Sequence, residues 1–552
     1  MLMRDFTTVK QIFNGQSVVA YLILTVFAVV TTLLLSYKFL QCIQQKNYCA
    51  SDYFKWINKK NNVFVMKIIM LSLLSCFAFC LFNVVFAFIK NDYFTFLGFV
   101  FYLFFIVLSL LGERKMENKV PLKYTNRIKR LIATYCVISF IIFFALLILE
   151  NLIFYYFSDF FKLERFAIVT IFPSLMPFLI FVSDAINKPI EKRINKKFVK
   201  KVTEFLDKSN LIKIGITGSY GKTSVKNYLR DILSVKYRVV ATPSSYNTPM
   251  GICKSAELIK DDTQVFIAEM GARQKGDIKE LCEIVKPQIG VLTGIAPVHL
   301  LTFGNLENVI KTKNEIMEYP SIQTGVFTAD NENVLKLYED FKKEKFLAGE
   351  NEKALVKVSN VKADKNGSSF DLTIDGETVT CQTEILGRHN ISNVALACAV
   401  AYKLGLTLQE ISEGIKNLKS VEHRLNLINE NGVTIIDDGY NSNVEGTKSA
   451  LETLSYFSGR KIIITPGMTE LGLEQNKLNY DFGVRMANVA DYVILVEGGS
   501  CNAIREGLVF GGEFDAEKVK IVASLQKAKE KLAEIVKEGD VILFENDLTD
   551  RF

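Results

Sequence analysis

Residues 214–226, IGITGSYGKTSVK, restrict the possible folds of this chain more than any other stretch. An apolar run typical of a buried strand ends here in a turn rich in Gly and Ser, and a helical pattern begins at about Lys222. Glycines in such a turn let backbone N–H groups close around phosphate oxygens, and the N-terminus of the following helix adds partial positive charge. The order of strand, loop and helix therefore predicts an α/β domain that binds the phosphates of a nucleotide.

The side chains of this loop fit the same prediction. Lys222 can reach the β- and γ-phosphates of a nucleotide, and the hydroxyl of Thr223 can bind Mg²⁺. The common form of the motif has a glycine where this chain has Ile216, so a chance glycine-rich turn before a surface helix is the alternative. The residues expected to contact the nucleotide are Gly218, Ser219, Gly221, Lys222, Thr223 and Ser224.

The first third of the chain has a different character, because its apolar residues form long uninterrupted windows. Each window has about the 17–25 residues that cross the hydrocarbon core of a bilayer. Pro173 and Pro177 predict a kink or a break in the last window. We therefore expect an α-helical membrane domain over residues 1–187 and a basic connector over residues 188–207. The five expected spans are 18–37, 68–89, 94–111, 131–149 and 166–182.

Basic residues between the windows predict the orientation of this domain. The loops 38–67 and 112–130 carry six and seven Lys and Arg, and residues 188–201 carry seven, whereas the alternate segments carry one or two. Lys and Arg accumulate on the cytoplasmic side of membranes, so we expect the N-terminus outside and the chain after residue 183 in the cytoplasm. The same loops account for the net charge of +7, which therefore gives no reason to expect nucleic acid.

No window carries an ionisable residue deep within its apolar stretch. A proton relay or an ion path would normally leave such residues, so transport has little support in the sequence. Two roles stay open for the five helices: an anchor and scaffold, or a groove for a lipid substrate.

Cysteine and histidine usage gives no sign of a metal cluster. The ten cysteines are scattered without a C-x-x-C pair, which indicates reduced residues and neither a disulfide framework nor a zinc site. Only three histidines exist, His299, His389 and His423. A lone histidine is usually a structural residue, and for His389 and His423 that alternative stays open.

After the connector, strand-like and helical patterns alternate to the end of the chain. This alternation predicts two α/β domains with parallel sheets: a phosphate-loop ATPase-type central domain, 208–420, and a Rossmann-like C-terminal domain, 421–552. Short alternating patterns around residues 354–387 indicate a small hairpin elaboration. Glu269 follows the apolar run VFIA, and a carboxylate at that strand end could reach a Mg²⁺ bound by Thr223.

Eight ordered segments give the central and C-terminal parts a family resemblance. The segments are ITGSYGKTSVK, TPSSYNTPMG, IAEMGARQKGDI, GIAPVHLLTFGNLENVIKTKNEI, GRHNISNVALA, HRL, IIDDGYNSNVEGTKSALETL and MTELG. Through them, from residue 212 to about residue 473, the chain resembles the Mur ligases, ATP-dependent amide-forming enzymes of cell-wall synthesis, and is most similar to the branch that adds D-alanyl-D-alanine.

The resemblance implies ATP and Mg²⁺ as cofactors and a role for each matching residue. Lys222 and Thr223 would hold the β/γ-phosphates and a first Mg²⁺, with Glu269 completing that site. His299 would serve a second Mg²⁺, and Lys313 stands where relatives often carry a carbamylated lysine.

Further residues would surround the nucleotide and the substrates. Four are implied near the nucleotide from later segments: Asn390 and Asn393 in its pocket, and Arg424 with Asp437 or Asp438 closing from the C-terminal domain. The residues implied at the substrates are Asn247, Tyr440, Asn441 and Asn443.

Three departures from the family limit what the resemblance implies. The domain that binds a uridine-nucleotide sugar has no counterpart, and the expected membrane helices stand in its place. The family element G-D-M-x-E-L-G reads PGMTELG from Pro466, so one acidic group is missing. Where the D-alanyl-D-alanine branch has K-G-S-R, this chain has the sequence ENDL from Glu545.

The sequence as a whole predicts a membrane-anchored ATP-dependent ligase. It would join an amino acid or short peptide amine to a carboxylate on a cell-envelope precursor, including one linked to lipid. A poly-γ-glutamate-type synthase is the alternative within the same class. A nucleotide-dependent membrane transporter or regulator, and a non-catalytic scaffold, are the alternatives from other classes.

Overall fold

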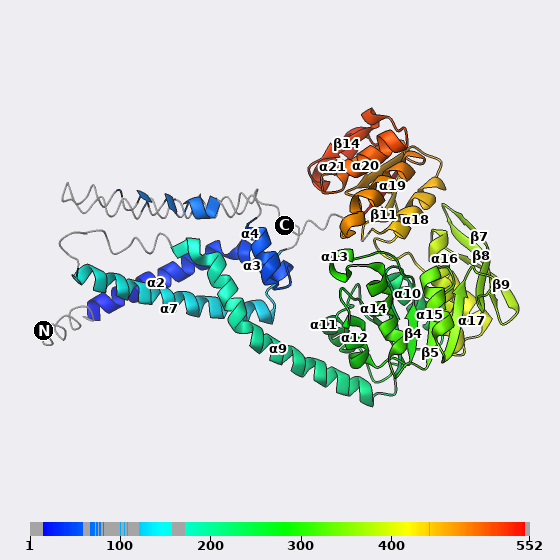
Figure 1. Cartoon of the computed structure of the whole chain (residues 1–552), viewed down its shortest axis with the longest axis horizontal. Coiled ribbons are helices and arrows are strands. Elements are labelled where there is room, and N and C mark those ends of the chain that lie inside the picture. The colour runs from blue at the N-terminus through cyan, green and yellow to red at the C-terminus, as the bar shows by residue number, and fades with distance from the viewer. Residues whose placement is uncertain are drawn as a thin grey trace. The chain divides into compact units, whose positions relative to one another are not determined.

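The computed structural model describes residues 15–58, 121–156, 172–440 and 442–546, and isolated helical positions between 67 and 108. The chain divides between Ile194 and Asn195 into two compact units. We call them the helical unit and the α/β unit, and each is described by itself (Figure 1).

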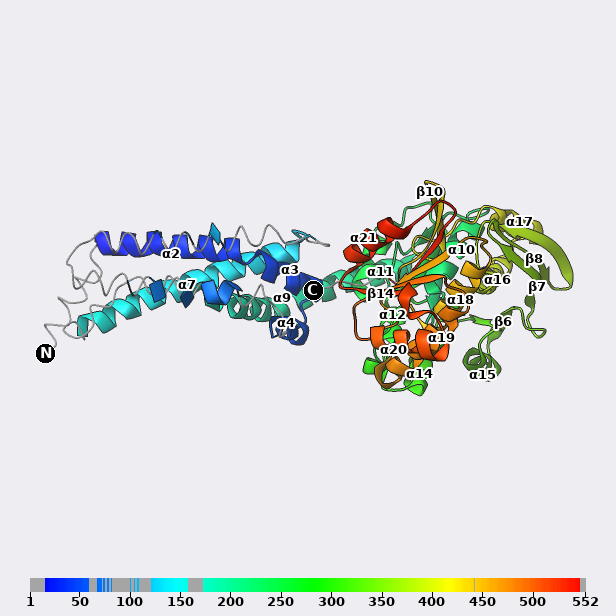
Figure 2. The ribbon, with the colours of Figure 1, turned by 90° about the horizontal axis from the view of Figure 1, so that it is seen from above.

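The helical unit is built around two long helices that run side by side in both views, α2 and α7 (Figures 1 and 2). Its apolar core is rich in buried aromatic rings, among them Phe39, Tyr53, Tyr135 and Phe143. The described elements are α2 (Gly15–Leu35), α3 (Tyr37–Gln45), α4 (Ala50–Ile57), α7 (Asn126–Tyr156), the 3₁₀ turn η1 (Phe172–Leu175) and α9 (Met176–Lys208).

The described residues do not support five membrane spans. One helix within them, Asn126–Leu149, is long and apolar enough to cross a membrane, and the bent pair Tyr21–Leu35 and Tyr37–Gln45 adds at most one more. The expected spans 131–149 and 18–37 fall on these helices. The windows 68–89 and 94–111 lie largely outside the described residues, as does the first part of 166–182. In the described part of that window, η1 gives way to α9 next to Pro177, which agrees with the predicted break.

The first sheet of the α/β unit has nine strands in the order β2-β3-β1-β4-β5-β6-β7-β8-β9. It is parallel from β2 to β7, whereas β7, β8 and β9 pair antiparallel. The expected hairpin elaboration is therefore continuous with the main sheet. The strands are β1 (Ile212–Thr217), β2 (Val239–Ala241), β3 (Val265–Glu269), β4 (Ile289–Leu292), β5 (Thr324–Thr328), β6 (Glu344–Gly349), β7 (Val356–Asp364), β8 (Gly367–Ile374) and β9 (Glu377–Thr383).

The register of the central strands brings the expected site residues to one edge of this sheet. Ile216 of β1 pairs with Glu269 at the end of β3, and Thr217 pairs with Leu292 at the end of β4. The phosphate loop, Glu269 and the segment leading to His299 therefore all start at the carboxyl ends of neighbouring strands. Open α/β sheets bind their ligands at this edge.

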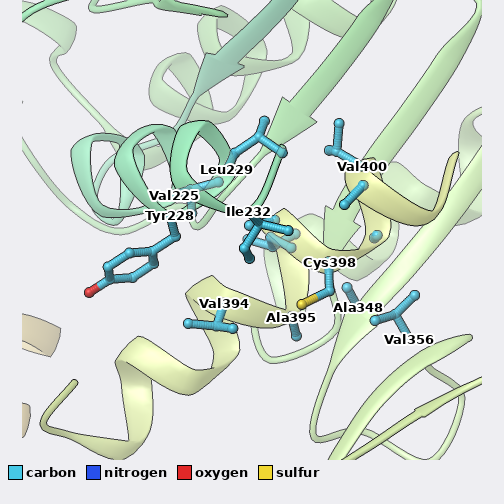
Figure 3. Packing of buried hydrophobic residues seen from close by; sticks show 14 of the residues in the cluster. Val225, Tyr228, Leu229, Ile232, Ala348, Val356, Val394, Ala395, Cys398 and Val400 are labelled. Atoms are coloured by element: carbon cyan, nitrogen blue, oxygen red, sulfur yellow. The ribbon is translucent and has the colours of Figure 1, made fainter. Parts of the chain in front are cut away.

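Helix α10, which follows the phosphate loop, is held by a buried apolar contact with α16. Figure 3 shows Ile232 of α10 next to Cys398 of α16, and the same buried cluster contains Leu229 and Ala395. Small side chains on α16 let the two helices approach closely. The helices around this sheet are α10 (Lys222–Leu233), α11 (Pro249–Ala256), α12 (Asp277–Val285), α13 (Leu300–Phe303), α14 (Leu306–Glu318), α15 (Glu332–Asp340), α16 (Arg388–Lys403) and α17 (Leu408–Lys416).

The second sheet has six strands in the order β10-β11-β15-β12-β13-β14, and only β10 runs antiparallel to its neighbour. Both α/β domains expected from the sequence are therefore present. The strands are β10 (Asn426–Glu430), β11 (Val433–Asp438), β12 (Lys461–Thr465), β13 (Tyr492–Val496), β14 (Val519–Val522) and β15 (Val541–Glu545). The main helices are α18 (Val444–Ser455), α19 (Gln475–Ala487), α20 (Cys501–Glu506) and α21 (Leu525–Ile535).

Candidate active site

The phosphate loop is folded tightly against the segment that follows β4. The backbone N–H of Ser219 donates to the Gly294 carbonyl at 2.6 Å, and its hydroxyl donates to the Ala296 carbonyl at 3.0 Å. Gly221 has φ +76°, and a Cβ there would lie 2.6 Å from Oδ1 of Asn393. Both the backbone conformation and the space at this position therefore require glycine.

Lys222 points its ammonium group back into the loop. Its Nζ donates to the carbonyl oxygens of Gly218 at 2.7 Å and Ser219 at 3.2 Å. Burial, together with the positive charge of Arg424, lowers the pKa of Lys222 to about 8, and the charge of Glu269 opposes this shift. A bound phosphate would bring a second negative charge near Lys222 and raise this pKa again.

Glu269 is the centre of a buried polar cluster beside the loop. Its Oε2 accepts hydrogen bonds from the Thr223 hydroxyl at 3.0 Å and from Nζ of Lys226 at 3.1 Å. Its Oε1 accepts from Nδ2 of Asn247 at 3.1 Å. The structure thus places Asn247, expected at the substrates, directly on Glu269.

Oxygen ligands at this cluster fit a magnesium ion that also contacts phosphate. Mg²⁺ is usually bound by one or two protein oxygens, with waters and substrate phosphates completing its coordination. The Thr223 hydroxyl and the Glu269 carboxylate, 3.0 Å apart, provide such oxygens next to the phosphate loop. The described residues contain no group of three or more His, Cys, Asp or Glu that could hold a metal by itself, so the phosphates would supply the remaining ligands.

His299 lies at the start of α13 in a left-handed backbone conformation, with φ +50°. Its Nδ1 makes a very short contact with Oε2 of Glu470, which also has a positive φ, +63°. Glu470 is the acidic residue that the PGMTELG segment retains, and it comes from the C-terminal half of the α/β unit. The two halves of the unit therefore meet at a residue expected to serve Mg²⁺.

Lys313 on α14 is buried and lines the same pocket. Its pKa lies well below the usual range, mainly because of burial and also because of the charge of Lys222, while Asp277 and Glu315 act in the opposite direction. Within the part of the chain that the structure describes, its ammonium group makes no hydrogen bond or ion pair. Burial therefore acts against the charged form of Lys313.

One pocket of about 380 Å³ brings together most of the expected site residues. It is lined by both halves of the α/β unit, and it also contains Arg273, Asp277 and Glu280, which sequence reasoning did not assign. The expected residues that line it are Gly218, Ser219, Gly221, Lys222, Thr223, Ser224, Asn247, Glu269, His299, Lys313, Arg424, Tyr440 and Asn443.

Tyr440 of the C-terminal half makes two contacts at this pocket. The guanidinium of Arg424 lies 4.5 Å from the centre of the Tyr440 ring. The hydroxyl of Tyr440 donates a very short hydrogen bond to the hydroxyl of Ser245, on the loop that follows β2. Asn443 caps α18 by accepting from the backbone N–H of Gly446 at 3.1 Å.

Four of the expected residues that the structure describes, Asn390, Asn393, Asp437 and Asp438, do not line the pocket. Asn390 donates to the Leu386 carbonyl at 2.8 Å, and Asn393 lies behind Gly221. Asp437 contacts Nδ1 of His423 at 2.7 Å. Asn441 lies outside the described residues.

The fourth of them, Asp438, makes its contacts within the C-terminal domain. It accepts from the backbone N–H of Leu425 at 3.3 Å, and burial raises its pKa to about 6. Its neighbour across the strands is Glu545, the first residue of the segment that replaces K-G-S-R. The two aspartates of β11 are therefore engaged within the C-terminal domain.

Sequence reasoning missed two contacts of the site, those made by Lys226 and Glu470. Lys226 comes one helical turn after Lys222, on the same face of α10, which is the only sign of its role in the sequence. Nothing local in the sequence relates Glu470 to His299, because 171 residues separate them.

These features define a phosphate-loop nucleotide-binding protein whose pocket is completed by a second α/β domain. Residues 216–401 match the family "Mur ligase middle domain", and residues 423–545 match the family "Mur ligase, glutamate ligase domain". The chain belongs to the Mur ligase family. It is thereby an ATP-dependent acid–amino-acid ligase that uses Mg²⁺, and the predictions of family, enzyme class and cofactors are confirmed.

Relatives of known function agree with this assignment. The UDP-N-acetylmuramoyl-tripeptide–D-alanyl-D-alanine ligase of Escherichia coli K12 is 28% identical over 318 residues, covering 57% of this chain and 70% of the relative. The enzyme of the same name from Bacillus subtilis 168 is 26% identical over 334 residues, covering 60% and 72%.

Solved structures show the same fold. The crystal structure of MurF ligase from Thermotoga maritima in complex with ADP is 26% identical, with a TM-score of 0.57, and covers 64% of this chain and 80% of that one. MurF from Acinetobacter baumannii has a TM-score of 0.58 at 23% identity, covering 64% and 77%.

Proposed function

We propose that this chain is a peptide ligase of cell-wall synthesis that activates a carboxylate as an acyl phosphate and couples it to an amine. One observation carries the proposal. The Thr223–Glu269 pair, typical of a phosphate-bound Mg²⁺ site, shares its pocket with His299 and Lys313. A carboxylate is a poor acyl donor by itself, so an enzyme with this site gains from transferring a phosphoryl group to it.

The reaction has two steps that balance without a further reactant. A carboxylate oxygen of the first substrate attacks the γ-phosphorus of ATP, and ADP leaves. The amine nitrogen of the second substrate then attacks the acyl carbon, inorganic phosphate leaves, and a proton passes from the amine to solvent. When bound, Mg²⁺ neutralises charge on the phosphates.

The chain's own residues would bind and orient these groups. Lys222 would hold the β/γ-phosphates, and Thr223 with Glu269 would orient the first Mg²⁺. His299 would orient a second Mg²⁺, with Glu470 fixing its ring. The buried amine of Lys313 would be carbamylated: its nitrogen would add to the carbon of CO₂ and lose a proton to solvent, which would leave a negatively charged carbamate.

The remaining expected residues would act from the walls of the site. Asp437 or Asp438 would reach the nucleotide only after a further movement of the C-terminal domain, since neither lines the pocket in this structure. Asn390 and Asn393 belong to the same domain as the phosphate loop, and Asn393 would act from behind Gly221. Arg424 already lines the pocket and would contact phosphate. The incoming amine would lie against Tyr440, Asn441, Asn443 and Asn247.

We propose the substrates from the names of the relatives, with one change. UDP-N-acetylmuramoyl-tripeptide and D-alanyl-D-alanine are the pair that those names give. The apolar N-terminal third of the chain lies outside the residues that match the family, which favours a precursor delivered at the membrane, including one linked to lipid.

We also propose that the chain is a multi-pass protein of the cell membrane. Its N-terminus would lie outside and its α/β unit in the cytoplasm, with the domains divided as 1–187, 188–207, 208–420 and 421–552. The excess of Lys and Arg in residues 112–130 and 188–201 supports this orientation. Two of these arginines are paired, since Arg130 contacts Glu191 at 2.6 Å and Arg127 contacts Asp184 at 3.5 Å.

The activity is tested by ADP release from ATP with each substrate alone and with both. We expect release to require both the carboxylate and the amine, and to stop in Lys222→Ala and Glu269→Gln variants that still insert into membranes. Release that needs neither substrate, or full turnover in Lys222→Ala, would contradict the assignment. Stimulation by a transmembrane gradient would favour a transporter instead.

A further inference from the structure

Lys226 is a buried cation beside the site that none of the roles above includes. It lies on α10, one turn after Lys222, and both its side chain and that of Glu269 are 1% exposed. Its Nζ donates to Oε2 of Glu269 at 3.1 Å and makes a very short hydrogen bond to the Ser244 carbonyl oxygen. A lysine is almost never fully buried unless its charge is paired, so these two contacts account for its presence.

The contact with Glu269 leaves that carboxylate with few alternative orientations. Thr223 and Lys226 share Oε2, and Asn247 holds Oε1. The backbone N–H of Glu269 donates to the Thr242 hydroxyl at 3.1 Å. Among the side chains that the structure describes around this carboxylate, Lys226 is the one that brings a full positive charge into contact with it.

The second contact of Lys226 holds the loop formed by residues 242–248. Ser244, whose carbonyl accepts from Lys226, has a left-handed backbone with φ +45°. The next residue, Ser245, accepts the hydrogen bond from Tyr440 of the C-terminal half. One ammonium group therefore contacts both the carboxylate of the expected metal site and the loop on which the C-terminal half rests.

We propose that Lys226 is a positioning residue that orients Glu269 for the metal and fixes the 242–248 loop for its contact with Tyr440. The inference rests on the proposed role of Glu269 as a Mg²⁺ ligand. Residues that orient a metal ligand typically change metal affinity about 10- to 100-fold when they are replaced. Lys226 would thus act through Glu269 and the loop, without touching a substrate.

The first test measures metal binding directly, with Mn²⁺ as the probe and electron paramagnetic resonance of the full-length protein in the presence of ADP. We expect Lys226→Met to raise the Mn²⁺ dissociation constant about 10-fold or more. The matched control is Lys213→Met. Lys213 is also buried, but its Nζ donates a hydrogen bond to the Leu206 carbonyl at 2.9 Å, away from the expected metal site. This control should leave Mn²⁺ affinity unchanged.

A second measurement separates positioning from general loss of stability. Hydrogen exchange in Lys226→Met should accelerate in residues 242–248, while the core of β12 and β13 stays protected as in the natural protein. Lys226→Arg, which keeps the charge, should recover part of the Mn²⁺ affinity. Unchanged Mn²⁺ binding in Lys226→Met, or an equal loss in Lys213→Met, would overturn the proposal.

The Glu269→Gln variant distinguishes the failure of this inference from that of the proposed function. If Glu269→Gln weakens Mn²⁺ binding and Lys226→Met does not, only the role of Lys226 is wrong. If neither variant weakens it, Glu269 is not a metal ligand and the proposed site itself is wrong.

Discussion

Lys222 is held by the carbonyl oxygens of its own loop, and its lowered pKa makes nucleotide binding depend on pH. Phosphate next to the ammonium group raises its pKa again, so binding takes up a proton at any pH above about 8, the pKa in the free protein. We therefore expect the ADP dissociation constant to be flat below pH 8 and to rise above it, by up to about tenfold per pH unit.

Calorimetry in buffers of different ionisation enthalpy would count the proton taken up by this binding. Lys222→Met should bind ADP more weakly at every pH, and its affinity should no longer fall above pH 8. If the natural protein shows a flat profile up to pH 9.5, the ammonium of Lys222 does not face the phosphates.

At the scale of elements, the phosphate loop depends on a close approach between α10 and α16. Gly221 precedes α10 in a left-handed conformation, and a Cβ there would lie 2.6 Å from Oδ1 of Asn393 on α16. We expect Gly221→Ala to displace the loop and to raise the ADP dissociation constant about tenfold or more, equivalent to about 1.4 kcal/mol.

Gly276 provides a matched control for this prediction. It also precedes a helix in a left-handed conformation, with φ +92°, but a Cβ there would meet nothing within 4 Å. Gly276→Ala therefore adds the same kind of backbone strain without the collision, and we expect its ADP affinity to stay near that of the natural protein. Equal losses in the two variants would show that backbone strain alone is responsible.

The elements could be predicted from the sequence where their pattern is local. Strands β1, β3 and β4 and the helix after the phosphate loop are strongly apolar or periodic. Strand β10, Asn426–Glu430, was missed because it lies at a sheet edge and is partly exposed, so it reads as polar. The hairpin elaboration at 354–387 is present, but its attachment to the main sheet through the pairing of Ala348 with Val356 is not predicted, because no local pattern reveals it.

Contacts within the site could likewise be predicted only where they follow from local sequence patterns. Thr223 and Glu269 were expected to meet because both follow neighbouring parallel strands, and they do. The contact of Lys226 with Glu269 and that of His299 with Glu470 join residues 43 and 171 positions apart. Such contacts depend on how helices and domains pack, which motif and spacing do not contain.

At the scale of the whole molecule, the membrane orientation predicts which side of the bilayer exposes Cys49. This free cysteine is exposed and lies in the 38–67 loop, expected in the cytoplasm. A maleimide that does not cross membranes should label Cys49 in inverted vesicles and leave it unlabelled in intact cells, as read by mass spectrometry of its peptide.

A Ser17→Cys variant gives the opposite expectation, because residues 1–17 are expected outside. Its new thiol should react in intact cells, and Cys49→Ser should lose the labelling seen in vesicles. Labelling of Cys49 in intact cells would reverse the proposed orientation.

The most direct test of the ligase mechanism follows one oxygen atom from the carboxylate substrate to phosphate. UDP-N-acetylmuramoyl-tripeptide labelled with ¹⁸O in its terminal carboxylate would be turned over with ATP and D-alanyl-D-alanine, and the released phosphate analysed by mass spectrometry. Because the amine displaces phosphate from an acyl phosphate, we predict one ¹⁸O in each phosphate. Turnover that releases unlabelled phosphate would contradict carboxylate activation by this protein.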